Sequence, residues 1–410
     1  MVARDPGVLT ARRRFRSLFA LYLLPGLALA SWVTRTPAVR DVLGASTAEM
    51  GLVFFGLAAG SMAGVLAGTP LVRRWGTRAV IVLTLGFWIG GTFAVAGGVA
   101  LASSVVVGAG LTAFGLGLGC AEISFNIDGT EVERQLGRPI LPFLHGAFSV
   151  GTVIGAVLGI RLAGIRFPPE LQLAAAATVA LAVAVVAIRG IPAGHAIDRT
   201  VAGRIRSGGT GAWREPRVVR IALIVLVLAL AEGTANDWLP LVMVDGHGMP
   251  QSTSAVVYTA FAASMAAGRF SGPSLLRRFP RVAVVAASGC FAALGLLGVM
   301  LAPSAALAFT AVVLWGLGAA LGFPVSISAA AEGDPGSSPG RVGAVATTGY
   351  IGFLSGPPLL GLLGEYVGLR EALVVVLLLV VTAIVLAPAV APLTPSPTTS
   401  GRRDAGRSAT

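Results

Sequence analysis

The sequence contains no lysine, and all 30 of its basic residues are arginines. Charged residues make up only 12% of its 410 residues, whereas about 25% is typical of soluble domains. The two cysteines, Cys120 and Cys290, both lie in apolar stretches, so no disulfide framework is expected. These shortages exclude a soluble globular protein and a disulfide-rich secreted one, and they indicate a protein that crosses a membrane many times.

Motifs of enzymes and ATPases are also missing. The three histidines, His145, His195 and His247, do not have the spacing of a metal site. No His-Glu-x-x-His or Gly-x-Ser-x-Gly motif occurs, and no phosphate-binding loop precedes a lysine. We therefore expect no enzymatic activity, no metal and no cofactor. The longest polar segment is too short to form a signalling domain, which argues against a sensor.

The net charge of +12 does not indicate a nucleic-acid partner, because the arginines fall in short segments between apolar runs. If these runs cross a membrane in turn, most of the arginines lie on the same side as the N-terminus. Such a bias marks the cytoplasmic side, so we expect a multi-pass inner-membrane protein with both termini in the cytoplasm.

The apolar runs, bounded by Arg, Pro, Gly or Asp, predict an all-α membrane protein with twelve transmembrane helices. The fourth, seventh and tenth runs are long enough to tilt or to protrude from a bilayer. The twelve expected spans are 16–36, 48–72, 78–99, 103–130, 140–164, 170–189, 218–244, 252–276, 281–301, 305–331, 341–365 and 370–391.

Similar features recur about 200 residues apart in the two halves of the chain. Leu27–Ala30 pairs with Leu228–Ala231, and Gly64-xxx-Gly68 followed by two arginines pairs with Gly268-xxx-Gly272 followed by two arginines. We therefore predict two pseudo-symmetric six-helix bundles, 1–189 and 218–391, joined by a cytoplasmic linker at 190–217. The tail 392–410, rich in Pro, Ser and Thr, is expected to be disordered. The small-residue pairs are read as helix-packing positions.

The fourth span carries unusual polar residues. Glu122 and Asn126 are four residues apart and share one helix face, and Asp128 follows. A carboxyl group inside a bilayer costs about 2.5–3.5 kcal/mol on insertion scales, so such residues usually face a wet or protein-lined interior. This stripe predicts the lining of a cavity. The alternatives are a capped helix end at the membrane surface and a Glu122 permanently paired to Arg269.

The chain resembles the major facilitator superfamily over nearly its whole length, in its twelve spans, its two halves and the basic loop after span two. That family carries Gly-x-x-x-Asp-(Arg/Lys)-x-Gly-(Arg/Lys)-(Arg/Lys) in this loop. Arg74, Gly76 and Arg78 match the motif, whereas Arg73 stands in place of the Asp. The second copy, with Arg277 and Arg278, has lost its Asp too. The resemblance implies that these arginines belong to a cytoplasmic gate, although the Asp of its usual ion pair is missing.

Within that family, Ala121–Asn126 is similar to the Leu-Glu-x-x-x-Asn segment of the fucose:proton symporter group. The resemblance implies that Glu122 couples transport to protons and that Asn126 contacts the solute. That group also has a carboxylate in span one, where this chain has none. Three alternatives remain: simpler coupling, substitution by Glu232 of span seven, or no proton coupling. With Ser-Trp-x-x-Arg-x-Pro in span one and Gly-x-Ala-Asn-Asp-Trp-Leu-Pro in span seven, the chain resembles poorly characterised bacterial inner-membrane permeases of this branch more closely than fucose permease itself.

Other polar residues of the spans are weaker candidates. Asn236 shares a face with Glu232 and could contact the solute, or both could bridge helices through hydrogen bonds. Trp32 and Arg35 could form an aromatic platform and an anion clamp, or be interfacial anchors. His145 could contact the solute or serve only in packing. Arg269 is assigned to the gate.

Together these residues predict a secondary transporter that works by alternating access. We expect proton-coupled uptake of a small polar organic solute, sugar-like or a sugar acid, driven by the proton gradient. We expect a monomer in the lipid bilayer. The alternative is proton-driven efflux of a drug or metabolite, which is less favoured because span five lacks the Gly-Pro pair usual in antiporters of the family.

Overall fold

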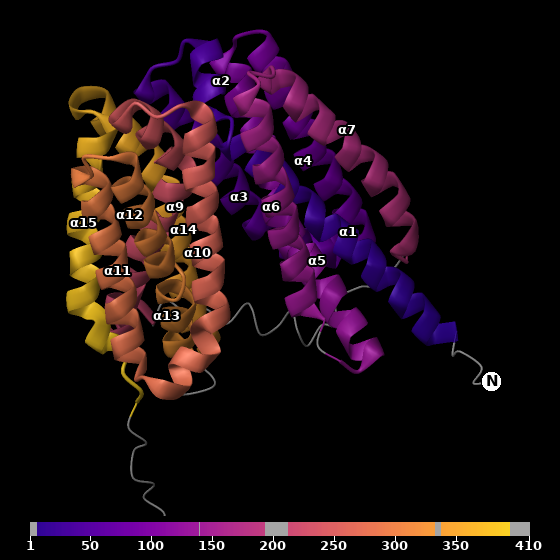
Figure 1. The fold of residues 1–410 in the computed structure, drawn as a ribbon. Coiled ribbons are helices and arrows are strands. Elements are labelled where there is room, and N and C mark those ends of the chain that lie inside the picture. The colour runs from indigo at the N-terminus through magenta and orange to yellow at the C-terminus, as the bar shows by residue number, and fades with distance from the viewer. Residues whose placement is uncertain (1–5, 139, 193–211, 333–337, 394–410) are drawn as a thin grey trace, which may run out of the picture.

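The computed structural model describes residues 6–138, 140–192, 212–332 and 338–393. Within these ranges the secondary structure is entirely helical (Figure 1). Most of the predicted linker and nearly all of the predicted tail lie outside the described residues.

Helices of the first half pack mainly against one another. The most extensive packing is of α5 with α3 and α4, and of α1 with α6. The elements of this half are α1 (Pro6–Val33), α2 (Thr36–Leu43), α3 (Thr47–Trp75), α4 (Thr77–Ala100), α5 (Ser104–Leu136), α6 (Leu141–Gly164), α7 (Pro169–Ala187) and the short η1 (Ile188–Gly190).

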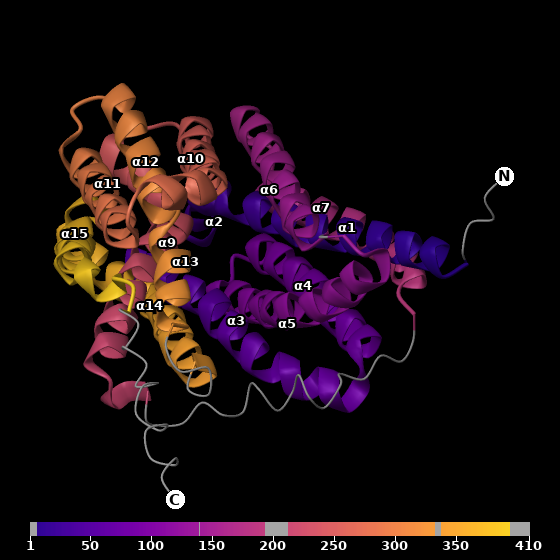
Figure 2. The same cartoon turned by 90° about the horizontal axis from the view of Figure 1, so that it is seen from below.

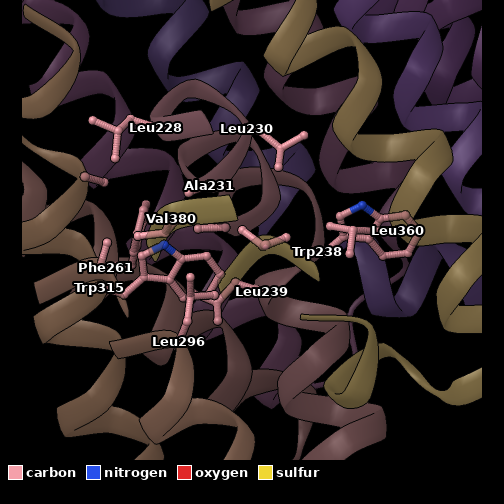
Figure 3. Packing of buried hydrophobic residues seen from close by; sticks show 14 of the residues in the cluster. Leu228, Leu230, Ala231, Trp238, Leu239, Phe261, Leu296, Trp315, Leu360 and Val380 are labelled. Carbon is pink, nitrogen blue, oxygen red and sulfur yellow. The ribbon is translucent and has the colours of Figure 1, made fainter. Parts of the chain in front are cut away.

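Helices of the second half form another group, in which α9 packs against α14 and α11 against α12. Its interior is filled by large apolar side chains, among them Trp238, Trp315 and Phe261 (Figure 3). Its elements are η2 (Ala212–Arg214), α9 (Pro216–His247), α10 (Gln251–Arg278), α11 (Arg281–Leu301), α12 (Ala305–Ala319), α13 (Gly322–Ala330), α14 (Ser338–Val367), α15 (Leu369–Leu386) and η3 (Ala387–Val390).

Ten segments of the described chain are long and apolar enough to cross a membrane. They include α5 and α9, which have 33 and 32 residues and were expected to be long. The two remaining expected spans, 252–276 and 341–365, correspond to α10 and α14. These are helices of 28 and 30 residues but do not reach the apolar character of the other ten. Twelve spans therefore remain a prediction.

The tenth expected span is broken into α12 and α13 at Ala320 and Leu321. Pro324 explains the break, because proline has no N–H to donate and its ring clashes with the carbonyl four residues earlier, here that of Ala320. Pro25, Pro70, Pro240 and Pro273 lie inside continuous helices.

Glycines let α3 and α5 approach very closely. A Cβ atom on Gly115 would lie 2.2 Å from the carbonyl oxygen of Leu57, and one on Gly64 would lie 2.3 Å from that of Leu116. No larger residue fits at either position without moving a backbone. Gly64 thus serves in helix packing, as the sequence predicted.

The two groups of helices meet at one end of the molecule. Figure 1 shows the ribbons close together near α2 and diverging toward the end where α1 begins at Pro6, and Figure 2 shows the two groups side by side from below. We name these the α2 end and the Pro6 end. Three polar contacts between the groups occur among the described residues, and all are at the α2 end: an Arg40–Asp245 ion pair, a 2.9 Å hydrogen bond from Gln251 to Asp41, and a 3.1 Å bond from the Ala48 N–H to Glu365.

Apolar contacts close the same end. The ring of Phe54 on α3 packs edge-on against Trp238 on α9, with centroids 5.0 Å apart. Nearby, α3 and α14 cross with Gly51 of α3 in contact with Gly361 of α14. A Cβ on Gly361 would lie 2.8 Å from the Cα of Gly51. At the Pro6 end, by contrast, the polar contacts of the described chain stay within each group.

Candidate functional site

Glu122 lies within α5, and its side chain is exposed. No described residue forms a hydrogen bond or ion pair with it. It lies close enough to Tyr22 of α1 and Tyr350 of α14 to interact electrostatically with both hydroxyl groups. Because α1 and α14 belong to different halves, this carboxyl faces the space between them rather than lipid.

One helical turn further, Asn126 joins three helices. Its Oδ1 accepts a 2.9 Å hydrogen bond from the Tyr22 hydroxyl of α1 and lies 3.1 Å from Nε2 of His145 on α6. The Tyr22 ring also packs edge-on against His145, with centroids 5.4 Å apart. With two neighbours on Oδ1, the amide NH₂ of Asn126 is left to donate to another group.

These residues give the first half a mixed set of hydrogen-bonding groups. The Asn126 NH₂ donates, the Glu122 carboxylate accepts, and Glu122 can also donate when protonated. A hydroxyl group both donates and accepts, so a polyhydroxylated molecule matches this set. The structure thus brings together Glu122, Asn126 and His145, three of the residues that the sequence predicted.

Asp128 has a different role. It forms an ion pair with Arg14 in which Nε of the arginine is 2.8 Å from Oδ2 and a second guanidinium nitrogen contacts Oδ1. Thr77 of α4 donates a 3.3 Å hydrogen bond to the same carboxylate. Both charged side chains are almost fully buried. This bidentate pair fastens α1 to α5 and leaves no free group for a ligand.

Glu232 of α9 is paired with Arg269 of α10 through one contact of 2.9 Å. The Glu232 side chain is 12% exposed and that of Arg269 is 49% exposed. Arg269 therefore lies beside Glu232, eight residues before the basic pair Arg277 and Arg278 with which it had been grouped. It does not pair with Glu122.

Further along α9, Asn236 accepts a 3.4 Å hydrogen bond from the hydroxyl of Tyr258 on α10. This arrangement resembles the contact between Tyr22 and Asn126 in the first half. Asp237 has no hydrogen bond or ion pair with any described residue, and its side chain is partly exposed.

Trp32 and Arg35 lie at the α2 end, apart from the Asn126 cluster. The buried Trp32 ring packs edge-on against Phe54, with centroids 6.2 Å apart, and so belongs to the seam between the halves. Arg35 is buried and donates to the carbonyl oxygen of Phe167, which ties the start of α2 to the segment before α7. Burial lowers the pKa of its guanidinium.

The arginines assigned to a gate lie at the Pro6 end. Arg73 and Arg74 are exposed at the end of α3, Arg78 is half-buried, and Arg277 and Arg278 are exposed at the end of α10. None of the five is ion-paired with a carboxylate of the described chain. This agrees with the loss of the Asp from both copies of the loop motif.

Sequence reasoning missed Tyr22 and Tyr258, whereas Tyr350 was a weaker candidate for the cavity lining. Of the four tyrosines in the chain, Tyr22, Tyr258 and Tyr350 all lie near the acidic groups of the spans. A search for tyrosines within the expected spans would have found them. The pairing of Arg14 with Asp128 could not be found in this way, because 114 residues separate the two.

Comparison with known proteins gives consistent results. A family model described as Major Facilitator Superfamily matches residues 142–350, half of the chain. An uncharacterised MFS-type transporter of Yersinia pestis is 26% identical over 90% of this chain and 94% of its own length. Membrane protein MosC of Rhizobium meliloti is 27% identical over 87% and 85%.

Several solved structures share the fold. The nucleoside transporter NupG aligns with a TM-score of 0.72 at 15% identity, covering 92% of this chain and 98% of its own. A bacterial homologue of the lysosomal transporter Spinster, inward-facing and unoccupied, has a TM-score of 0.70 at 16% identity, covering 96% and 100%. The fucose:proton symporter FucP in the outward conformation has a TM-score of 0.60 at 17% identity, covering 92% and 99%.

The family match, the relatives and the apolar helices together identify a multi-pass membrane transporter of small molecules, not an enzyme. This chain belongs to the major facilitator superfamily.

Proposed function

We propose that the protein imports a small polar organic solute, sugar-like or a sugar acid, together with protons. Two six-helix bundles, counted as twelve spans, would rock about a central chamber between α1, α5, α9 and α12–α13. The arginine distribution supports a cytoplasmic location for the Pro6 end. With that orientation, the contacts between the halves at the α2 end would make this conformation open to the inside.

The observation that carries the proposal is the unpaired Glu122, which faces the other half one turn from the Tyr22–Asn126–His145 cluster. No arginine of the described chain pairs with this carboxyl group, so it is free to bind a proton. Protonation would remove its charge and allow the loaded carrier to reorient, because moving a bare charge through the low-dielectric core is costly. Asn126 and His145 would hold the solute beside it.

The comparisons support this class of function without naming the solute. Neighbours of the same fold include a nucleoside transporter and a fucose:proton symporter. The superposition is better on an inward-facing transporter (TM-score 0.70) than on an outward one (0.60). The same proposal holds that the protein works as a monomer and uses the proton gradient without a cofactor.

The test is uptake of radiolabelled sugars and sugar acids into proteoliposomes, with and without a pH gradient. We expect wild-type protein to accumulate one of these solutes only with the gradient, and Glu122→Gln to retain exchange at equal pH while losing accumulation. Glu371→Gln, at the α2 end of α15, is the matched control. Undiminished accumulation by Glu122→Gln would remove Glu122 as the coupling group, and accumulation only in inside-out vesicles would indicate efflux.

A further inference from the structure

Two carboxylates within the expected spans, Asp128 and Glu232, form ion pairs with arginines of the described chain, and the two pairs differ in kind. Arg14 binds Asp128 through two nitrogens, and both side chains are at most 2% exposed. Arg269 contacts Glu232 through one nitrogen, and 49% of its side chain is exposed. The Arg14–Asp128 pair is buried, whereas the Arg269–Glu232 pair leaves about half of the Arg269 side chain exposed.

The exposed part of Arg269 is expected to face a wet space rather than lipid. A guanidinium group in contact with acyl chains is among the most costly placements in a membrane, and such residues face the interior of the bundle or a water-filled cavity. Its partner Glu232 shares a face of α9 with Asn236, and Tyr258 reaches Asn236 from α10 as Arg269 reaches Glu232. These four side chains line one seam between α9 and α10.

A guanidinium group has five N–H donors in a planar fork that matches a carboxylate. Only one hydrogen bond from Arg269 to a described residue is present. A second carboxylate of a small molecule could therefore bind the free donors or displace Glu232 from the group.

We propose that Arg269 binds a carboxylate of the transported solute, and that Glu232 occupies Arg269 when no solute is bound. This rests on the proposed function and narrows it, within the proposed solutes, from sugars to sugar acids. On the opposite half, the carboxyl group of Glu122 and the NH₂ group of Asn126 have no partner among the described residues and would bind the hydroxyl groups of the same molecule. The two ends of the solute would thus bridge the two halves.

The test is equilibrium binding to the purified full-length protein, measured by thermal unfolding in detergent. The probes are paired by charge: D-glucuronate with D-glucose, D-galacturonate with D-galactose, and D-gluconate with D-sorbitol. We expect at least one acid to raise the melting temperature while its neutral partner does not. Arg269→Gln should abolish this response.

Glu232→Gln is the decisive variant, because it keeps Arg269 and removes the internal competitor. We expect it to bind the acid about tenfold more tightly, as one charge-assisted hydrogen bond no longer has to be displaced. If the ion pair between Glu232 and Arg269 had only a structural role, Glu232→Gln would not increase the affinity for the acid. Arg220→Gln, an exposed arginine of α9, is the control for loss of one positive charge and should bind as wild type does.

Three results would overturn the proposal: no response to any acid by wild type, a response that persists in Arg269→Gln, or unchanged affinity in Glu232→Gln. If Arg269→Gln does not fold, the affinity of Glu232→Gln still decides. The assay uses no gradient, so Glu122→Gln should bind the acid even though it fails to accumulate solute. Failure of proton coupling and failure of the Arg269 subsite are therefore distinguishable.

Discussion

The hydroxyl group of Tyr22 on α1 donates a 2.9 Å hydrogen bond to Oδ1 of Asn126 on α5. His145 of α6 approaches the same oxygen, so the side-chain amide is fixed between three helices. This contact orients the NH₂ group of Asn126, and its consequences can be measured.

Tyr22→Phe should raise the KM for the transported solute about two- to tenfold with little change in kcat. It removes one hydrogen bond, worth about 0.5–1.5 kcal/mol, but preserves the ring packing against His145. Initial uptake rates in proteoliposomes measure the effect. Tyr366→Phe, whose side chain is exposed, is the matched control. An unchanged KM would show that Tyr22 does not position the site.

Asp128→Ala should destabilise the protein by about 3–5 kcal/mol, because it leaves the buried guanidinium of Arg14 without its partner. The double variant Arg14→Met, Asp128→Leu should recover most of the loss, since neither charge then needs compensation. Denaturant unfolding monitored by tryptophan fluorescence measures both. Glu131→Gln, which breaks the exposed pair with Arg134, should change stability little. Equal losses in Asp128→Ala and the double variant would contradict the argument.

Gly51→Ala should shift the protein toward a conformation open at the α2 end. The added Cβ would lie 2.8 Å from the carbonyl oxygen of Pro357 and 3.0 Å from the Cα of Gly361, so α3 and α14 must separate there. Spin labels on cysteines at positions 41 and 251, with Cys120 and Cys290 replaced, would report the change. We expect a longer distance than in the Gly51 parent.

Gly86→Ala is the control for the steric clash in Gly51→Ala, because a Cβ at Gly86 meets no atom within 4 Å. It makes the same chemical change in α4 and should leave the label distance as it is. A distance that stays short in Gly51→Ala would mean that the crossing of α3 and α14 does not hold the end closed.

The Arg40–Asp245 ion pair should contribute weakly to the same closure. Its side chains are 18% and 32% exposed, and partly exposed pairs contribute at most about 1 kcal/mol. Arg40→Asp removes this attraction and adds a repulsion of similar size, so it should open the α2 end by no more than about thirtyfold in the equilibrium constant. Adding Asp245→Arg should restore closure, measured with the same pair of labels. High salt should reproduce part of the effect of the single variant.

Much of the fold could be predicted from the sequence because a bilayer imposes a simple rule on a chain. A backbone in hydrocarbon must satisfy its own hydrogen bonds, so each long apolar run becomes a helix. The bounds of α4 and α11 follow the expected spans 78–99 and 281–301 closely. The expected spans 252–276 and 341–365, which correspond to α10 and α14, are less apolar than the other ten because they include residues such as Arg269 and Gly356.

The candidate site was predicted in part. Glu122 and Asn126 stood out because polar side chains are rare in apolar spans, and four-residue spacing placed them on one face. His145 joined them in the structure, whereas Trp32 and Arg35 lie at the α2 end. The sequence does not show which helices pack against each other. Tyr22 was therefore missed, and Arg269 was grouped with Arg277 and Arg278.

The sequence by itself determined that this chain is a bundle of membrane helices with isolated charges inside it, since hydrophobicity and helical periodicity are local properties. Only the tertiary structure decided which charge is neutralised by which. Asp128 is paired with the buried Arg14, Glu232 makes a single contact with Arg269, and Glu122 has no ion-pair partner among the described residues. The reason is physical: an ion pair depends on a separation of a few ångströms in space, and packing between distant helices sets that separation.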